Sequence, residues 1–222
     1  HCYKANGPRG IVMSLQTFKH RFDLIKKINP LLTQIALGIG SIDAIPDLFP
    51  MMQYCRDNGI IPNITVNGDL TIYDIKWLGE LAGAVSISNY DTPTTIEIVD
   101  LCSPYIKQLN VHQVLAKETL EECYNLIDHI DPSKLHALVL LWIKPKGRAS
   151  EGYNFVTYKE LHALIKYALS KGITLGFDSC SAPYIWNFPE FKDSKESIEP
   201  CESGLFSLYL SASGYFYPCS FA

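Results

Sequence analysis

Along most of this chain, short apolar runs alternate with segments in which apolar residues recur at the spacing of one helix face. This alternation limits the fold more than any other feature of the sequence. Six runs have the length and β-branched content of strands, and they cover residues 33–37, 60–66, 84–88, 106–112, 137–143 and 174–177. Most are apolar at successive positions, which is typical of parallel strands covered on both faces.

Between these runs, apolar residues recur with the period of a helix. The first stripe covers residues 15–25, with Ser14 as its expected N-cap. The other stripes lie further along the chain, and Thr157 and Glu160 precede the last one at the spacing of a capping box; they cover residues 48–55, 120–130 and 161–169.

Strand and helix units that repeat roughly every 25–35 residues predict crossover connections between parallel strands. We therefore expect an α/β fold, a partial (β/α)6 TIM-like barrel over residues 1–177, followed by a cysteine-rich segment over residues 178–222. An open, doubly wound sheet is the alternative, because alternation alone does not decide whether a sheet closes.

The composition argues against two classes of partner. A chain of 222 residues with 47% apolar content can bury one full core and carry an appendage. Its net charge of −4 argues against binding nucleic acid through phosphate neutralisation. No apolar run approaches the ~18 residues that cross a membrane, and no signal peptide is visible. Seven cysteines, an odd number, suit a reducing cytoplasm.

The segment after Phe177 contains three cysteines in loop-prone sequence. Cys180 comes first, and Cys201 is followed by twelve residues, a glycine, four residues and Cys219. In a chain without secretory features, cysteines spaced in this way indicate metal ligands rather than disulfides. Zinc and iron–sulfur both suit three thiolates. The segment is too short for a core of its own, so a bound metal would stabilise it.

The cysteines of the interior favour a different interpretation. Cys55 and Cys123 lie on the apolar stripes of their helices, and Cys102 lies just past a helix-like stretch. We expect all three to be small core residues.

The two ends of the chain together resemble the radical S-adenosylmethionine (radical SAM) enzymes of the SPASM/twitch type. The chain opens with Cys2 and Tyr3, which are similar to the end of that family's Cys-x3-Cys-x2-Cys-aromatic loop. The cysteine and glycine spacing after residue 200 is similar to the family's auxiliary-cluster segment. The resemblance spans nearly the whole chain and implies that its barrel is truncated, so we expect this piece alone to be inactive.

The resemblance implies a specific chemistry. Three cysteines, of which Cys2 is one, would hold a [4Fe–4S] cluster, and S-adenosylmethionine would bind beside it, near Tyr3. Cys180, Cys201 and Cys219 would hold an auxiliary iron–sulfur cluster. Reductive cleavage of the cofactor would give a 5′-deoxyadenosyl radical that abstracts hydrogen from a substrate, possible substrates being peptides and proteins. Flavodoxin or ferredoxin would donate the electron, and no catalytic residue is identified.

The first expected cofactor loop follows the run at residues 33–37. It contains Gly38, Gly40, Ser41 and Asp43, and glycines let a backbone approach a ligand closely. In the family this position carries a Gly-Gly-Glu segment that binds the methionine end of the cofactor. Ser41 replaces the glutamate, so Ser41 or Asp43 would receive the ammonium group, Asp43 with charge assistance. A glycine-rich turn without a ligand is the alternative.

Further polar residues follow the next three runs. By resemblance, Asn67 faces the cofactor and Ser88 lies near its ribose or carboxylate. His112 at the expected end of its strand is predicted to be a satisfied polar residue, not a catalytic one. Lys144 and Lys146 lie in a basic loop that suits either a carboxylate or phosphate ligand or plain solvation.

Two other functional classes remain open. One is a non-catalytic relative that has lost cofactor binding, which the serine at position 41 permits. The other is a binding protein stabilised by zinc at the C-terminal cysteines.

Overall fold

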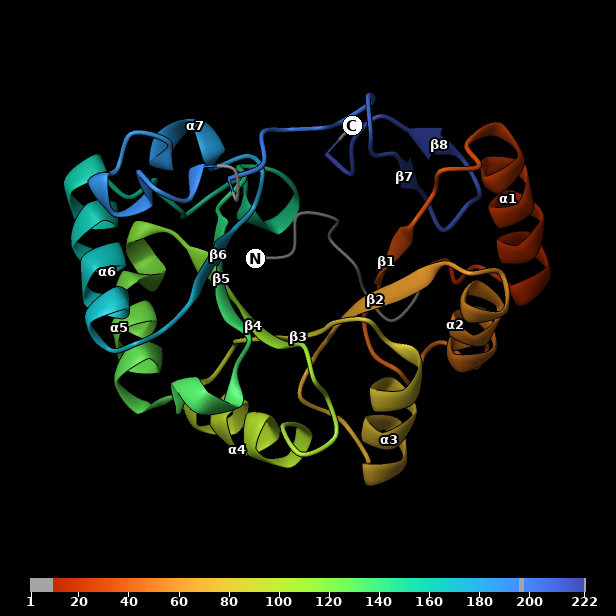
Figure 1. The fold of residues 1–222 in the computed structure, drawn as a ribbon, viewed down its shortest axis with the longest axis horizontal. Coiled ribbons are helices and arrows are strands. Elements are labelled where there is room, and N and C mark those ends of the chain that lie inside the picture. Colours follow the sequence, from red (N-terminus) through yellow and green to blue (C-terminus); the bar gives the residue numbers. More distant parts are fainter. Residues whose placement is uncertain (1–9, 196–197, 222) are drawn as a thin grey trace.

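Six parallel strands form one curved sheet, in the order in which they occur along the chain (Figure 1). The structure, a computed structural model, describes residues 10–195 and 198–221. The strands are β1 (Gln34–Gly38), β2 (Ile61–Val66), β3 (Val85–Ser88), β4 (Leu109–Leu115), β5 (Ala137–Trp142) and β6 (Leu175–Phe177). A sheet in sequential order is that of a β/α barrel, whereas a doubly wound sheet reverses its order at a switch point. The predicted partial barrel is confirmed, and the sheet remains open between β1 and β6.

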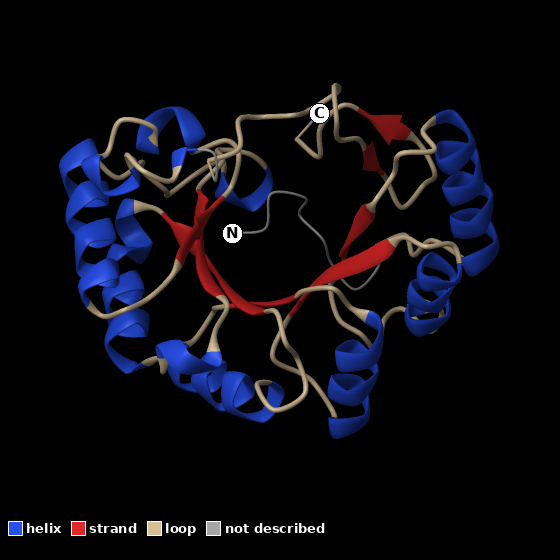
Figure 2. Cartoon of the chain, in the orientation of Figure 1, coloured by secondary structure: helices blue, strands red, loops and turns tan. Residues whose placement is uncertain are grey.

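Helices cover the convex side of this sheet, as Figure 2 shows. The longer ones are α1 (Leu15–Ile28), α2 (Leu48–Asp57), α3 (Ile72–Leu81), α4 (Thr92–Cys102), α5 (Leu120–His129) and α6 (Tyr158–Ser170). Shorter turns of helix are η1 (Lys117–Thr119), η2 (Pro132–Lys134), η3 (Gly147–Ala149), α7 (Ala182–Ile185) and η4 (Pro189–Phe191). Within the described ranges, no helix has both the length and the apolar character needed to cross a lipid bilayer.

Local capping explains where several helices begin. Ser14 accepts a hydrogen bond from the main-chain N–H of Thr17 at the start of α1, as predicted. The predicted capping box before α6 is also present, with Thr157 and Glu160 bonded to each other's main-chain N–H groups. α3 and α4 were not among the predicted stripes, although Thr71 forms the same kind of box in front of α3.

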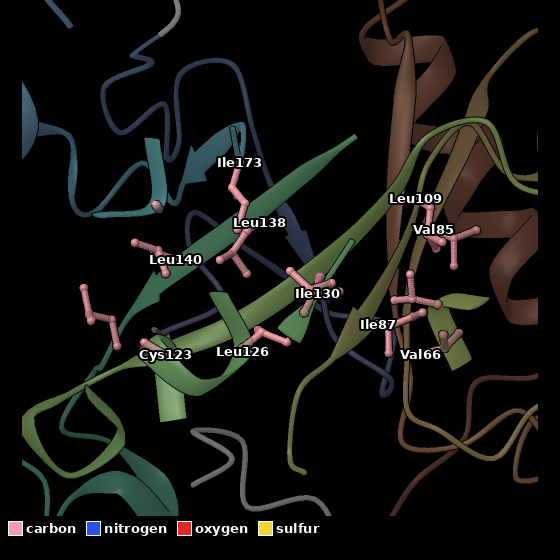
Figure 3. Packing of buried hydrophobic residues seen from close by; sticks show 14 of the residues in the cluster. Val66, Val85, Ile87, Leu109, Cys123, Leu126, Ile130, Leu138, Leu140 and Ile173 are labelled. Atoms are coloured by element: carbon pink, nitrogen blue, oxygen red, sulfur yellow. The ribbon is translucent and has the colours of Figure 1, made fainter. Parts of the chain in front are cut away.

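The main core lies between the convex face of the sheet and the helices (Figure 3). Its members include residues of β3, β4, β5 and α5, and Figure 3 labels Val85, Ile87, Leu109, Leu138, Leu140, Cys123 and Leu126 among them. Cys55, Cys102 and Cys123 are fully buried, which confirms the prediction for these three residues. Burial raises the pKa of each of their thiols to about 12, so they remain protonated and unreactive.

β4 lies three residues further along the chain than its apolar run predicted. The run begins at Ile106, but the main-chain N–H groups of Tyr105 and Ile106 both bond to the carbonyl of Cys102, so this part is a turn after α4. The strand instead begins at Leu109. His112 therefore lies in the middle of β4, not at its end, and the prediction of its position was wrong.

The C-terminal segment folds back to the first helix. β7 (Tyr209–Leu210) and β8 (Phe216–Tyr217) form a small antiparallel hairpin, which Figure 1 shows next to α1. Gly214 in its turn has a φ of +83°, and a Cβ there would lie 3.3 Å from Arg21 Nε and 3.6 Å from Thr17 Cγ2 of α1. Glycine at this position therefore serves both the turn and the close contact with the helix.

Candidate functional site

The carboxyl ends of β1, β2 and β3 carry most of the residues predicted to bind a cofactor. Gly38 is the last residue of β1, Asn67 directly follows β2, and Ser88 is the last residue of β3. Because the strands are parallel, these ends meet at one rim of the barrel. In barrels of this type, ligands bind at that rim.

Asn67 joins the first two of these loops. Its side-chain Nδ2 donates a hydrogen bond of 2.5 Å to the main-chain carbonyl of Gly40. Gly68 comes next, and a side chain there would meet Ile98 Cδ1 of α4 at 2.7 Å. The loop after β2 thus packs closely on α4, while Asn67 reaches across to the loop after β1.

The loop after β1 exposes its backbone. At Gly38 and Gly40, a Cβ atom would meet nothing within 4 Å, so the main chain borders open space. Ser41 is half-buried and Asp43 is exposed, in a turn that is closed by a bond from Ile45 N to the carbonyl of Ile42 (2.9 Å). A bare backbone beside a hydroxyl and a carboxylate suits the amino and carboxyl groups of an amino-acid ligand.

Asp47 fixes the other end of this loop. Its carboxylate accepts a hydrogen bond of 3.0 Å from the main-chain N–H of Leu15, the first residue of α1. A negative charge at a helix N-terminus is favourable because it offsets the positive end of the helix dipole. The loop after β1 is therefore attached to α1 on one side and to Asn67 on the other.

The concave face of the sheet carries polar residues on β2, β3 and β4. In the sheet register, Thr65 of β2 pairs with Ser86 of β3, which pairs with Asn110 of β4, and Ser88 pairs with His112. The residues between them on β3 and β4 belong to the core on the opposite, convex face. This polar row lies directly below the rim.

His112 is the most distinctive member of the row. Its Nδ1 lies 3.5 Å from Thr65 Oγ1, across the intervening strand. Burial lowers the pKa of His112 to about 4, so the imidazole is neutral at physiological pH and can both donate and accept a hydrogen bond. Sequence reasoning placed His112 at a strand end and did not assign it to this face. The alternation of Leu109, Asn110, Val111 and His112 was the available signal.

The three C-terminal cysteines do not form one group of ligands within the described residues. Cys180 follows β6 and is exposed, Cys201 is exposed, and Cys219 is half-buried after β8, where its sulfur accepts a bond of 3.3 Å from Phe221 N. In the part of the chain that is described, no three histidine, cysteine, aspartate or glutamate side chains are placed to hold a metal ion. Cys2 and Tyr3 lie outside the described residues.

Lys144, two residues after β5, lies near two of these cysteines, Cys180 and Cys219. It forms an ion pair with Asp178, and its Nζ lies 5.4 Å from the centre of the Phe221 ring. Burial lowers the pKa of Lys144, while the charges of Cys180 and Cys219 act in the opposite direction. Both thiols therefore lie within electrostatic range of the same ammonium group.

Lys146 of the same loop donates a hydrogen bond to the main-chain carbonyl of Phe221. Both lysines of the basic loop thus contact residues of the chain's own C-terminal part. The sequence had left ligand binding and plain solvation open for this loop, and the structure adds these internal contacts.

A scan of the sequence against protein-family models found no match, and a search of curated proteins found none. Solved structures with the same fold do exist. The crystal structure of Streptococcus suis SuiB bound to S-adenosylmethionine is similar with a TM-score of 0.68 and 14% identity, covering 92% of this chain and 53% of SuiB. SuiB bound to the precursor peptide SuiA gives a TM-score of 0.73 at 14% identity, covering 98% and 55%. This chain shares their fold and spans about half of their length.

Proposed function

We propose that this chain is the barrel part of a radical SAM enzyme, which cleaves S-adenosylmethionine reductively at a [4Fe–4S] cluster and modifies a peptide or protein. The observation that carries the proposal is the rim, where Asn67 bonds to Gly40 beside open glycine backbone. It is supported by the shared fold of SuiB, whose structures hold S-adenosylmethionine and a precursor peptide.

The rim residues fit the methionine end of S-adenosylmethionine. The open backbone at Gly38 and Gly40 would lie against its amino-acid group. Asp43, which is exposed, would take the ammonium group, with Ser41 beside it. Ser88 at the end of β3 would contact the ribose or the carboxylate.

The cluster is assigned from the sequence alone. Cys2 would be one of its three thiolate ligands, and Tyr3 would lie beside the cofactor. When bound, the cluster and S-adenosylmethionine supply an electron and a hydrogen-abstracting radical, with flavodoxin or ferredoxin as the electron donor. The residues of this chain would bind and orient the cofactor, and the polar side chains on the concave face of β2, β3 and β4 would provide hydrogen bonds.

The C-terminal cysteines would hold an auxiliary iron–sulfur cluster. Cys180 and Cys219 both lie within electrostatic range of Lys144, and the spacing of the cysteines in the sequence carries this assignment. Cys201 would join them when metal binds, since metal binding can supply the energy that orders a short segment. Residues 178–222 would then form an auxiliary-cluster segment and residues 1–177 the barrel, in a protein that works in the reducing cytoplasm.

The test is anaerobic reconstitution of the natural protein at its full length. We expect bound iron and sulfide, and 5′-deoxyadenosine formation from S-adenosylmethionine once a reductant is added. The 222-residue chain alone should form none, because it contains only one of the three cluster ligands proposed at its N-terminal end. Failure of the natural protein to bind or cleave S-adenosylmethionine would contradict the proposal.

One observation favours a second candidate, a barrel that has lost cofactor binding. Ser41 occupies the place of the family's glutamate and has no charge to offer an ammonium group. In that case the reconstituted natural protein would not bind S-adenosylmethionine. Zinc without sulfide at the C-terminal cysteines would instead favour a zinc-stabilised binding protein.

A further inference from the structure

A buried group of polar side chains lies on the convex side of β3 and β4, behind the polar row. Asn89, Thr92, Thr95 and Gln113 are only 4%, 2%, 2% and 2% exposed. They come from the end of β3, from α4 and from β4. Polar side chains this deep in an apolar layer require hydrogen-bond partners.

These side chains are hydrogen-bonded to one another and to two neighbouring residues, Val114 and Glu122. Asn89 Nδ2 donates to Gln113 Oε1 over 2.6 Å, and Asn89 Oδ1 accepts from Thr95 Oγ1 over 2.6 Å. Gln113 Nε2 donates to the carbonyl of Val114 over 2.9 Å. Thr92 donates from both its main-chain N–H and its hydroxyl to Glu122 of α5.

Two members of this buried group lie next in sequence to residues at or near the rim of the barrel. Asn89 directly follows Ser88, and Gln113 directly follows His112, while Ser88 and His112 are register partners. The main-chain N–H of Asn89 also donates to the carbonyl of His112 over 2.9 Å. Because successive side chains of a strand point to opposite faces, the bonds of Asn89 and Gln113 on one face restrain Ser88 and His112 on the other.

Stability alone does not account for such a group. Replacing both partners of a buried hydrogen bond by apolar groups of the same shape can be nearly neutral or stabilising. A fully satisfied buried network instead fixes one arrangement of the elements that carry it. The arrangement fixed here is that of β3 relative to β4 at the rim.

We propose that the hydrogen-bonded group of Asn89, Thr95 and Gln113 is a positioning device that holds Ser88 and His112 in place for S-adenosylmethionine. This inference rests on the proposed function. These three residues act through Ser88 and His112 and do not touch the ligand.

The experiment uses the reconstituted natural protein and titrates S-adenosylmethionine by calorimetry. The triple variant Asn89→Leu, Thr95→Val and Gln113→Met replaces the group by apolar side chains of similar shape. We expect its melting temperature to stay within a few degrees of the unaltered protein, while its dissociation constant rises roughly 10-fold, as for residues that support other ligand sites. Thr95→Val alone, which removes one bond, should show a smaller rise.

Ser88→Ala provides the specific readout. If the group acts through Ser88, the variant that combines Ser88→Ala with the triple substitution will lose less binding free energy than the two variants lose separately in sum. Tyr167→Phe is the control, because it removes a hydrogen bond of 2.5 Å to Asp128 between α6 and α5 and should leave the affinity unchanged.

The outcomes separate the two proposals. Unchanged affinity in the triple variant, or full additivity with Ser88→Ala, would overturn the positioning role while the proposed function stands. The positioning role would also be overturned if, in both the triple variant and Thr95→Val, affinity fell only in proportion to the fall in melting temperature. If the unaltered protein does not bind S-adenosylmethionine, both proposals fail.

Discussion

The side-chain amide of Asn67 and the main-chain carbonyl of Gly40 lie 2.5 Å apart, and their hydrogen bond holds together the loops that follow two neighbouring strands. Asn67→Ala removes this bond and lets the two loops move independently. We expect affinity for S-adenosylmethionine to fall while the free energy of unfolding decreases by only ~0.5–1.5 kcal/mol.

The matched control for Asn67 lies on β2, the strand that precedes it. Asn63 bonds to Ala84 N and to Gln34 Oε1 near the opposite end of β2. Asn63→Ala should cost similar stability and leave affinity unchanged. An equal loss of affinity in both variants, measured by calorimetry, would show that the effect reports general loosening of the barrel.

Asp43 and Ser41 are predicted to differ in their effect on the cofactor. Asp43→Ala should weaken binding of S-adenosylmethionine by ~1.5–3 kcal/mol, the usual contribution of a hydrogen bond to a charged group. Ser41→Ala should weaken it less, because a hydroxyl offers no charge. Equal and negligible effects in the binding titration would place the methionine end elsewhere.

The C-terminal cysteines should differ from those in the core. Replacing Cys180, Cys201 or Cys219 with serine should lower the iron and sulfide content and make residues 178–222 more sensitive to protease. Cys123→Ala should leave metal content unchanged and lower only the free energy of unfolding, by ~1 kcal/mol or more, because it opens a small cavity. Metal content that is the same in all variants would refute this assignment.

His112 should make folding sensitive to acid. Its pKa of about 4 in the folded protein lies below its ordinary value near 6.5, so the unfolded chain binds the proton more tightly. The stabilising contribution is complete above pH 6.5 and is lost as pH falls toward and through 4. The loss amounts to at most ~3 kcal/mol.

Urea unfolding at pH 7 and pH 4.5 measures this effect. His112→Gln should flatten the decline of stability between these two pH values, and His129→Gln, at an exposed position of α5, should not. An identical decline in all three proteins would contradict the lowered pKa of the half-buried His112.

Gly214 and Gly152 form a pair that separates backbone strain from packing. Both have a positive φ, +83° and +81°, but only a Cβ at 214 would meet another residue, Arg21. Alanine at either position should cost ~1 kcal/mol for the backbone alone. Gly214→Ala should cost more and loosen the hairpin from α1, seen as faster cleavage by protease after residue 195. The same cost and the same cleavage rate in both variants would contradict the contact.

The alternation of strands and helices could be predicted from the sequence because it depends on local patterns of apolar residues. Capping by Ser14 and the box of Thr157 and Glu160 were also readable, since their partners lie three residues away. The start of β4 was not, because a turn bonded to Cys102 competes with the apolar run that contains Ile106.

The candidate site was only partly accessible for the same physical reason. The rim residues could be named from motifs, but the bond from Asn67 to Gly40 depends on how two loops approach in space. The hydrogen bond between Asn89 and Gln113 joins residues 24 positions apart in the sequence, so no local pattern predicts it. The contact of His112 with Thr65 spans 47 residues and crosses β3, so it depends on the assembled sheet.

The contact of Gly214 with Arg21 and Thr17 has a consequence for the order of events during synthesis. A chain leaving the ribosome forms its N-terminal elements first, so α1 and the barrel strands emerge well before the hairpin that rests on α1. Until residue 214 has been released, that face of α1 is uncovered and exposed to other proteins of the cell. The contact between the hairpin and α1 joins residues that lie far apart in the sequence, and such contacts form slowly compared with local ones. The hairpin therefore reaches α1 only after the six strands of the barrel have been made, and a nascent chain passes through a stage in which the barrel strands are present and this face of α1 is still uncovered.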